Sequence, residues 1–229
     1  MKIRSAFIFI TLLLIQVQGY SQRPAAGNWL TMQVPVQLNA HWQIHTDFNY
    51  RTLGNSVYSL QELHRLGLRY IFNTHWNTAI GGAVVYSRTS YSKENNEFAK
   101  EFRVWEEFNY KTPISNSLGF QARIRTEDRC FSATGSNAAY HAFRYRIKLQ
   151  LQQQIAAKLS ILIANEYMQQ HAHNSWSFDQ NRYIINGIYL MNKKTQIQAG
   201  YMRLQWPQHS AQNIMMLSFQ KTISFYAEQ

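Results

Sequence analysis

Residues 171–182, with the sequence HAHNSWSFDQNR, hold the residue types that nucleophilic catalysis requires. A serine nucleophile needs a histidine base within hydrogen-bond reach and a third group that orients the histidine ring. His173 and Ser175 are two positions apart, which places them on one face of an extended strand. Asn181 is the polar residue that could orient the ring. The segment therefore offers one candidate catalytic set: His173, Ser175 and Asn181.

The same segment makes a weaker case for a metal site. His171 and His173 could share an ion on one strand face, but two ligands are too few for a closed zinc site. No paired cysteines and no phosphate-cradling glycine loop occur in the chain. The lone Cys130 follows Arg129 in an expected loop. We therefore expect no metal and no cofactor.

A larger charged set occupies alternate positions in segments that are otherwise apolar. Its members are Glu101, Arg103, Glu107, Arg123, Arg125, Glu127, Arg144, Arg146, Lys148, Glu166 and Arg182. Buried charges without partners are costly, so the acids must pair with the cations if these side chains face an interior. The set predicts a charged network that fills a lumen. Because cations outnumber acids in it, a narrow anion-preferring pore is the functional alternative.

The segment FRYRIKLQL, residues 143–151, shows how these charges are placed. Its odd positions are all apolar, and Arg144, Arg146 and Lys148 take three of its four even positions. Successive side chains of a strand point to opposite faces, so the pattern predicts a strand with one apolar and one cationic face. Ten further segments alternate in a similar way.

A membrane barrel explains these segments. Each strand of such a barrel presents apolar side chains to lipid, and a tilted strand of about 9–11 residues crosses the bilayer. Aromatic residues often flank the apolar faces, as at Trp42 and Tyr50, which is typical of girdles at the membrane interfaces. A soluble sandwich also alternates, but its packed interior would not accommodate such charged faces. We therefore predict an all-β fold, an antiparallel transmembrane β-barrel.

The number of strands follows less directly from the sequence than the fold class does. Eleven segments alternate clearly, whereas bacterial barrels have even numbers of strands. We expect about twelve strands, with one more near residues 221–229, or ten if the first segment does not span the membrane. Glu106 falls on the apolar face of its segment, which suggests a β-bulge there.

The N-terminus has the features of a secretory signal. Two cations precede a short apolar run, residues 6–15, and the small residues Gly19 and Ser21 suit cleavage after position 21. The run is too short for a comfortable membrane-spanning helix, although an N-terminal anchor is the alternative. We expect residues 1–21 to be a cleaved signal peptide and residues 22–229 to form a single barrel domain.

The chain has 229 residues and a formal net charge of +11, which by itself suggests nucleic acid or an anionic surface as a partner. An exported protein rarely meets nucleic acid, and no block of five cations occurs. One cysteine allows no intrachain disulfide framework. We expect a monomer in the cell outer membrane, whose partners are outer-membrane lipids and lipopolysaccharide, with no nucleic acid.

Several stretches resemble one known family. They are FRVWEEF at 102–108, FRYRIKLQL at 143–151, NEYM at 165–168, FDQNRYIINGIYL at 178–190 and QAGYM at 198–202. The GNW of residues 27–29 resembles the start of the same family. That family is domain of unknown function family 2490, a group of small outer-membrane barrels in Gram-negative bacteria. The resemblance implies an outer-membrane location and no established activity.

Two functions remain open at this point. The first is a porin-like barrel that is not an enzyme and has a structural role, or binds or passes a small solute or lipid. The second is a hydrolase that loosely resembles outer-membrane phospholipase A, a barrel with a His-x-Ser pair and a following Asn-Arg. The sequence departs from that pattern, because no Asn-Gly follows Ser175 and Asn181 comes too soon.

Overall fold

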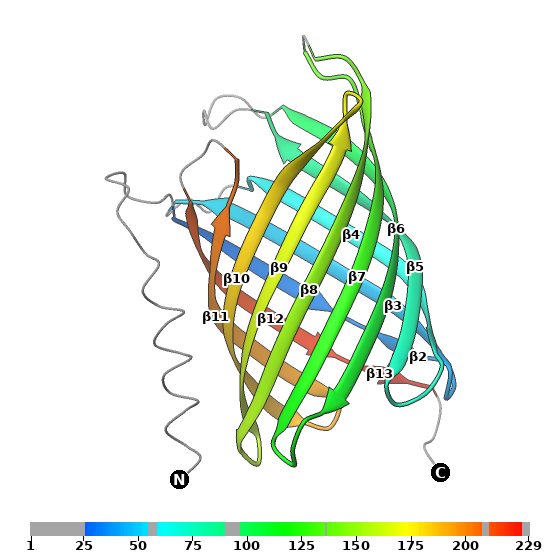
Figure 1. The fold of residues 1–229 in the computed structure, drawn as a ribbon, viewed down its shortest axis with the longest axis vertical. Helices are drawn as coiled ribbons and strands as arrows, with labels where there is room; N and C mark the ends of the chain where they lie inside the picture. The colour runs from blue at the N-terminus through cyan, green and yellow to red at the C-terminus, as the bar shows by residue number, and fades with distance from the viewer. Residues whose placement is uncertain (1–25, 55–58, 90–96, 136, 208–210, 226–229) are drawn as a thin grey trace.

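Thirteen strand elements form one sheet in the computed structural model (Figure 1). The structure describes residues 26–54, 59–89, 97–135, 137–207 and 211–225. The expected signal peptide, residues 1–21, lies outside the described residues. In chain order the strands are β1 (Ala26–Gln33), β2 (Val36–Gln37), β3 (Trp42–Leu53), β4 (Gln61–Ile71), β5 (Trp76–Arg88), β6 (Phe98–Pro113), β7 (Leu118–Phe131), β8 (Tyr140–Ala156), β9 (Leu159–Ala172), β10 (Ser175–Asn192), β11 (Thr195–Gln205), β12 (Gln212–Lys221) and β13 (Ile223–Ser224).

The sheet closes into a barrel through β1. Strands β3 to β12 pair antiparallel with their neighbours in chain order, and β1 pairs antiparallel with β3 and parallel with β12. β2 and β13 continue β1 and β12 and pair with each other. Pro35, which has no N–H to donate, lies between β1 and β2. The described wall therefore contains eleven strands, two of them interrupted.

The parallel pair resolves the question of strand number. The all-β barrel is confirmed, and it is antiparallel except at this closure. A closed sheet in which all neighbours are antiparallel must have an even number of strands, but one parallel pair removes that requirement. The eleven alternating segments of the sequence thus correspond to the eleven strands of the described wall. In place of a twelfth spanning strand, the described residues after β12 contain only the two-residue β13.

Two of the tight turns share the sequence pattern Asn-x-His-Trp, at residues 39–42 and 73–76. Asn39 Oδ1 accepts hydrogen bonds from the backbone N–H groups of His41 and Trp42, both at 2.9 Å. His41 Nδ1 donates to a carbonyl oxygen at the end of β4, also at 2.9 Å. The second turn repeats these contacts, with its histidine bonded to the end of β6. Each motif therefore fixes its own turn and ties it to the next hairpin.

The inward and outward faces alternate without interruption along β6. Trp105 and Glu107 are buried inside the barrel, whereas Phe102 and Phe108 are exposed on the outside. Glu106 also lies on the outside, and the pairing of β6 with β5 and β7 shows no register shift. The bulge suggested at Glu106 is therefore wrong, since this acid faces outward among apolar neighbours.

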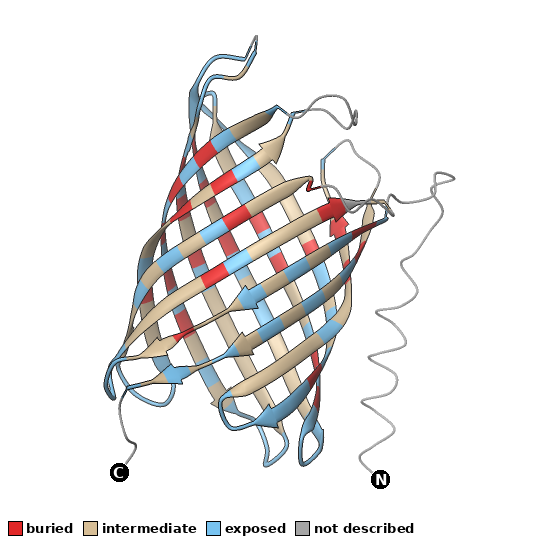
Figure 2. Ribbon diagram, turned by 180° about the vertical axis from the view of Figure 1, so that it is seen from behind, coloured by how far each residue is buried: buried red, intermediate tan, exposed pale blue. Residues whose placement is uncertain are grey.

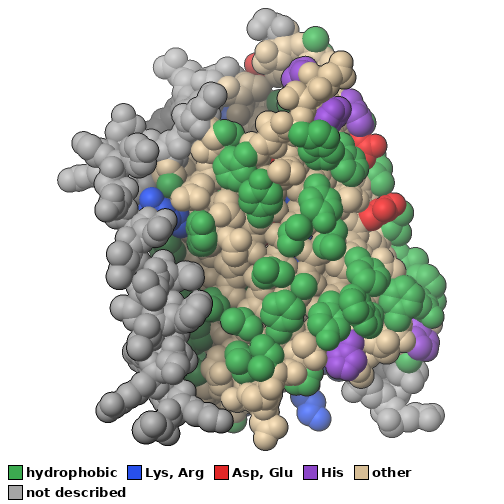
Figure 3. Space-filling model, in the orientation of Figure 1, with side chains coloured by type: hydrophobic (Ala, Val, Ile, Leu, Met, Phe, Trp, Pro, Cys, Tyr) green, Lys and Arg blue, Asp and Glu red, His purple; other side chains and the backbone are tan. Residues whose placement is uncertain are grey.

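Large apolar side chains cover the outer wall. Leu66, Ile80, Leu149 and Ile185 are each at least half exposed. Figure 3 shows such side chains spread over the strands of one face, and Figure 2 shows buried positions alternating with exposed ones along the strands. Over the described ranges, no helix has the length and apolar character to cross a membrane. The barrel thus buries a set of charged side chains and exposes many large apolar ones, although some apolar side chains such as Leu63 and Trp105 are also buried.

Trp105 packs against two glycines inside the barrel. Gly67 and Gly81 are direct partners across β4 and β5, and Trp105 of β6 pairs with Gly81. A Cβ added at Gly81 would lie 2.7 Å from the indole and 2.1 Å from the carbonyl oxygen of Leu66. The indole Nε1 donates to the carbonyl oxygen of Gly82 at 3.2 Å. The ring can approach the wall closely only because these positions lack side chains.

We predict that Gly81→Ala lowers the free energy of unfolding by about 1–3 kcal/mol, because the new methyl group overpacks the contact with Trp105. Urea unfolding in lipid vesicles, followed by tryptophan fluorescence, measures the change. Gly187→Ala is the matched control, since its Cβ would come no closer than 3.8 Å to a neighbour. Equal unfolding midpoints for the two variants would contradict the packing argument.

Candidate functional site

Charged side chains from β3, β4 and β6–β10 meet inside the barrel. All eleven charged residues predicted from the sequence lie there. The sequence reasoning missed six more: Asp47, Arg51, Arg65, Arg69, Arg129 and Asp179. The first five occupy the same alternate positions, so the alternation of polar and apolar residues could have predicted that they face the lumen too. Asp179 reaches Arg144 at 2.9 Å beside a register shift between Phe178 and Gln180, which period 2 does not predict.

Glu127 is the most enclosed member of this network, with 1% of its surface exposed. It accepts hydrogen bonds from Arg144 Nε at 2.9 Å and from Arg146 Nη1 at 2.5 Å. The guanidinium groups of Arg103 and Arg125 lie at 3.7 and 3.8 Å. One carboxylate on β7 therefore draws together arginines of β6, β7 and β8.

Glu166 of β9 has a comparable position. It accepts from Arg123 Nη2 at 2.5 Å, from Arg146 Nη2 at 2.7 Å and from Arg182 Nη1 at 3.2 Å. Its partners lie on three other strands, β7, β8 and β10. Because Arg146 also binds Glu127, the two glutamates form one connected network across the lumen.

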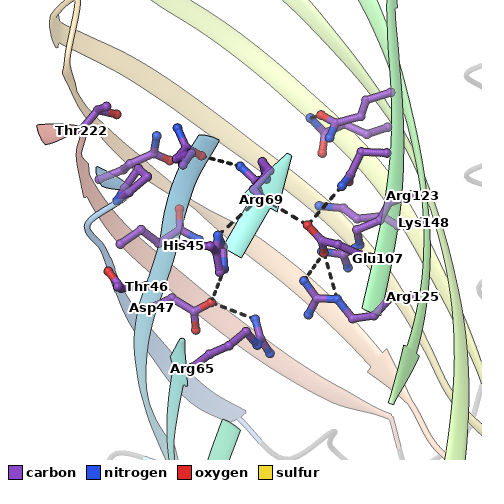
Figure 4. A pocket seen from close by; sticks show the side chains of 17 residues that line it. His45, Thr46, Asp47, Arg65, Arg69, Glu107, Arg123, Arg125, Lys148 and Thr222 are labelled. Atoms are coloured by element: carbon purple, nitrogen blue, oxygen red, sulfur yellow. Dashed lines mark hydrogen bonds and ion pairs between the residues drawn. The ribbon is translucent and has the colours of Figure 1, made fainter. Parts of the chain in front are cut away.

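Glu101 and Glu107 complete the pairing on β6. Glu101 binds Arg103 at 2.6 Å and Arg129 at 2.5 Å. Glu107 binds Arg125, lies 3.2 Å from Arg69, and lies 3.8 Å from Arg123. Figure 4 shows Glu107 between the arginines of β4 and β7. Bidentate and shared contacts of this kind hold guanidinium planes in fixed orientations.

The network carries more positive than negative charge. Its described members comprise eleven cations (the ten arginines named above and Lys148) and six carboxylates, which are Asp47, Glu101, Glu107, Glu127, Glu166 and Asp179. Within the described part of the chain, Arg51 and Lys148 have no carboxylate oxygen within 4.0 Å. The protein's own acids therefore leave a positive potential in the lumen.

Three cavities follow one another along the lumen. The first, of about 620 Å³, opens at the barrel end that carries the Asn-x-His-Trp turns, called the tight-turn end below. It shares the lining residues Gln121 and Gln150 with the second cavity, of about 280 Å³ (Figure 4). The third, of about 180 Å³, lies toward the other end. Arg65, Arg123 and Arg125 line both of the last two cavities and so lie between them. Lys148 lines the second cavity and Arg51 the third.

The candidate catalytic set is not assembled. β9 ends at Ala172 and β10 begins at Ser175, so the turn between them consists of His173 and Asn174, with φ of 50° and 60°. His173 stacks on Tyr140, and the Ser175 hydroxyl has one long contact, 3.5 Å, to the next backbone carbonyl. Asn181 instead accepts from Asn165 on the outer face. None of the described contacts joins His173, Ser175 and Asn181.

The two histidines of the first metal hypothesis are also apart in their contacts, since His171 lies against Trp176 and His173 against Tyr140. A different group could hold an ion. Ligand atoms of Asp128, Cys130 and His141 lie within 4.8 Å of one another, exposed on the outer face of β7 and β8. Exposed groups of this kind often carry no metal, and the expectation of no metal stays a prediction.

We predict that Glu127→Gln lowers the free energy of unfolding by about 3–5 kcal/mol, because it removes the carboxylate that four buried guanidinium groups share. Denaturant titration in lipid vesicles measures the loss. Glu106→Gln, the same substitution on the outer face, should leave stability unchanged or slightly higher. A Glu127→Gln protein as stable as the Glu106→Gln protein would show that the network does not depend on this carboxylate.

Comparison with known proteins agrees with the resemblance seen in the sequence. A family model described as "Protein of unknown function (DUF2490)" matches residues 26–215. The curated proteins gave no match. One solved structure, titled "NanC porin structure in rhombohedral crystal form", is 11% identical over 79% of this chain and 86% of that chain, with a TM-score of 0.47. The chain, whose described residues form a β-barrel, therefore belongs to the DUF2490 family of proteins of unknown function.

Proposed function

We propose that the protein is an outer-membrane β-barrel of a Gram-negative bacterium whose lumen binds and passes small anions. This proposal rests on the excess of cations over carboxylates in the lumen, along successive cavities that share lining residues. Under it, residues 1–21 direct export and are removed. The barrel acts as a monomer, with outer-membrane lipids and lipopolysaccharide as its surroundings.

The outer wall supports a membrane location. A soluble protein rarely exposes a contiguous apolar patch larger than a few hundred square ångströms, whereas exposed apolar side chains occur on strands all around this barrel. At the end with the tight turns, Trp42 packs on Tyr70 and Trp76 packs on Tyr110. Aromatic pairs at one level of the wall match the girdle of a membrane interface.

The lumen supports selection by charge. A low-dielectric wall strengthens the field of fixed charges, so unneutralised cations attract anions and repel cations. Lys148 and Arg51 supply such a charge in successive cavities. A solute that enters from the tight-turn end meets Lys148 first and Arg51 later, so the two could act as consecutive binding positions.

The arginines between the second and third cavities limit the size of a solute that can pass. Arg65, Arg123 and Arg125 are held there by Asp47 at 2.8 Å, by Glu166 at 2.5 Å and by Glu107, respectively. Side chains held by ion pairs do not move aside without cost. The geometry therefore favours small inorganic or short organic anions over larger solutes, and slow passage over open diffusion.

We predict that the protein is recovered in the outer-membrane fraction of a Gram-negative host. It should also migrate differently on a denaturing gel before and after boiling, because a closed hydrogen-bonded barrel resists detergent. Cell fractionation with this gel assay is the test. Recovery in the soluble periplasmic fraction would contradict the membrane location.

We predict anion selectivity for the purified protein in planar bilayers. Under a potassium chloride gradient the reversal potential should have the sign of chloride preference. Lys148→Gln should lower the chloride-to-potassium permeability ratio by at least about twofold, because one unneutralised charge is lost from the path.

Lys193→Gln is the control, because Lys193 is an exposed residue in the turn between β10 and β11. Its permeability ratio should match that of the unmodified protein. Two results would contradict the proposal. One is zero conductance at all applied voltages, and the other is a preference for potassium.

A further inference from the structure

The third cavity differs from the other two in its lining. Nine arginines surround its volume of about 180 Å³, together with Trp29, Asn49, Gln61 and Gln180. Among the described residues, no carboxylate takes part in this lining. The carboxylates that pair with eight of these arginines do not belong to the described lining. We call this cavity the arginine chamber.

Arg51 is the arginine of the chamber without a counterion. Its Nη1 donates to Gln61 Oε1, and its buried Nε has no acceptor among the described groups. The other eight arginines each have at least one carboxylate oxygen within 4.0 Å. A cation placed among cations without an acid is unfavourable for folding alone. Its position is favourable once an anion occupies the chamber.

Trp29 fixes the orientation of Arg51. The two residues are direct cross-strand partners on β1 and β3, and the guanidinium carbon of Arg51 lies 3.9 Å from the centroid of the indole. The guanidinium carbon of Arg182 lies 5.0 Å from the same centroid. Trp29 itself packs against the buried apolar cluster that contains Met202 and Leu204. The indole is therefore a rigid support for two guanidinium groups.

Arg182 has spare hydrogen-bonding capacity of the same kind. Its two terminal nitrogens donate to Glu166 at 3.2 Å and to Gln180 at 2.8 Å, and its buried Nε has no acceptor among the described groups. Arg51 and Arg182 thus each hold a buried N–H donor without a described acceptor beside one indole. A guanidinium fork matches the oxygens of carboxylate and phosphate groups.

We propose that the arginine chamber is a binding site for a small oxyanion with two negative charges, of the phosphate or sulfate class, with Arg51 and Arg182 as its principal ligands. This inference rests on the proposed function only in that solutes must reach the lumen. The surplus of positive charge favours a doubly charged over a singly charged ion. Apart from Trp29, the described lining side chains are all polar, and this suits a compact oxyanion better than a large organic solute.

The test measures binding of inorganic phosphate to the full barrel in detergent by isothermal titration calorimetry. Sulfate and acetate serve as doubly and singly charged comparisons. We expect phosphate and sulfate to bind more tightly than acetate. Arg51→Gln should weaken phosphate binding by at least about tenfold, because a charge-assisted ligand is lost. Arg203→Gln is the matched control, since Arg203 lies on β11 outside the chamber lining and should bind phosphate as the unmodified protein does.

A second measurement separates a ligand from a structural residue. Without phosphate, Arg51→Gln should be as stable as the unmodified protein or more stable, because it removes a repelled charge. Phosphate should raise the unfolding midpoint of the unmodified protein and not that of Arg51→Gln. Clear destabilisation of Arg51→Gln in the absence of phosphate would overturn the assignment.

The proposed binding site and the proposed passage of anions can be disproved independently of each other. If the barrel conducts with anion preference but phosphate binds no more tightly than acetate, or binds Arg51→Gln equally well, the site is wrong and the passage stands. If phosphate binds in an Arg51-dependent manner but the bilayer conductance is zero, the passage is wrong and the site stands.

Discussion

Buried ion pairs between glutamates and arginines fill the interior of this barrel, and the rest of the structure depends on them. A single closed sheet has no second layer to pack against, so its inward side chains must satisfy one another. Glu127 and Glu166 do this across four strands through their shared partner Arg146. Such pairs add little net stability compared with an apolar core, but removal of one partner is costly. The network therefore constrains the register of the strands more than it strengthens the fold.

A network that served only to fill the lumen would be expected to balance its charges. Here the described cations exceed the carboxylates, and Lys148 and Arg51 are the described members that have no carboxylate oxygen within 4.0 Å. Neither side chain is needed to neutralise an acid of the network. A residue that opposes the local rule for stability is most often retained at a functional site. The imbalance thus points to an external anion as the missing partner.

Much of the fold was predictable from the sequence, because period 2 assigns each side chain of a strand to one face. FRYRIKLQL was correctly read as an apolar wall with Arg144 and Arg146 inside. The pairing partners were not predictable, since Arg123 meets Glu166 across 43 positions of sequence and only the strand register brings them together. Arg51 was missed because the inward residues before it in β3 are mostly uncharged or acidic.

Local conformation was the other limit on prediction. Left-handed backbone at His173 and Asn174 permits a two-residue hairpin turn between β9 and β10, which residue types alone did not indicate. The strands therefore continue to the turn, and the residues that resembled a catalytic set are spread over a hairpin. The odd number of strands was likewise beyond local reasoning, because it follows from one parallel pairing between the two ends of the chain.

That parallel pairing also determines whether the arginine chamber exists. Trp29 lies on β1, the strand that pairs with both β3 and β12, and its register places it opposite Arg51. A shift of one residue in this strand would turn the indole outward and leave Arg51 without support. Arg182, on β10, contacts the same indole from the other side of the closure. The chamber is therefore completed by the same step that closes the barrel, and an unclosed sheet would contain its arginines without its binding geometry.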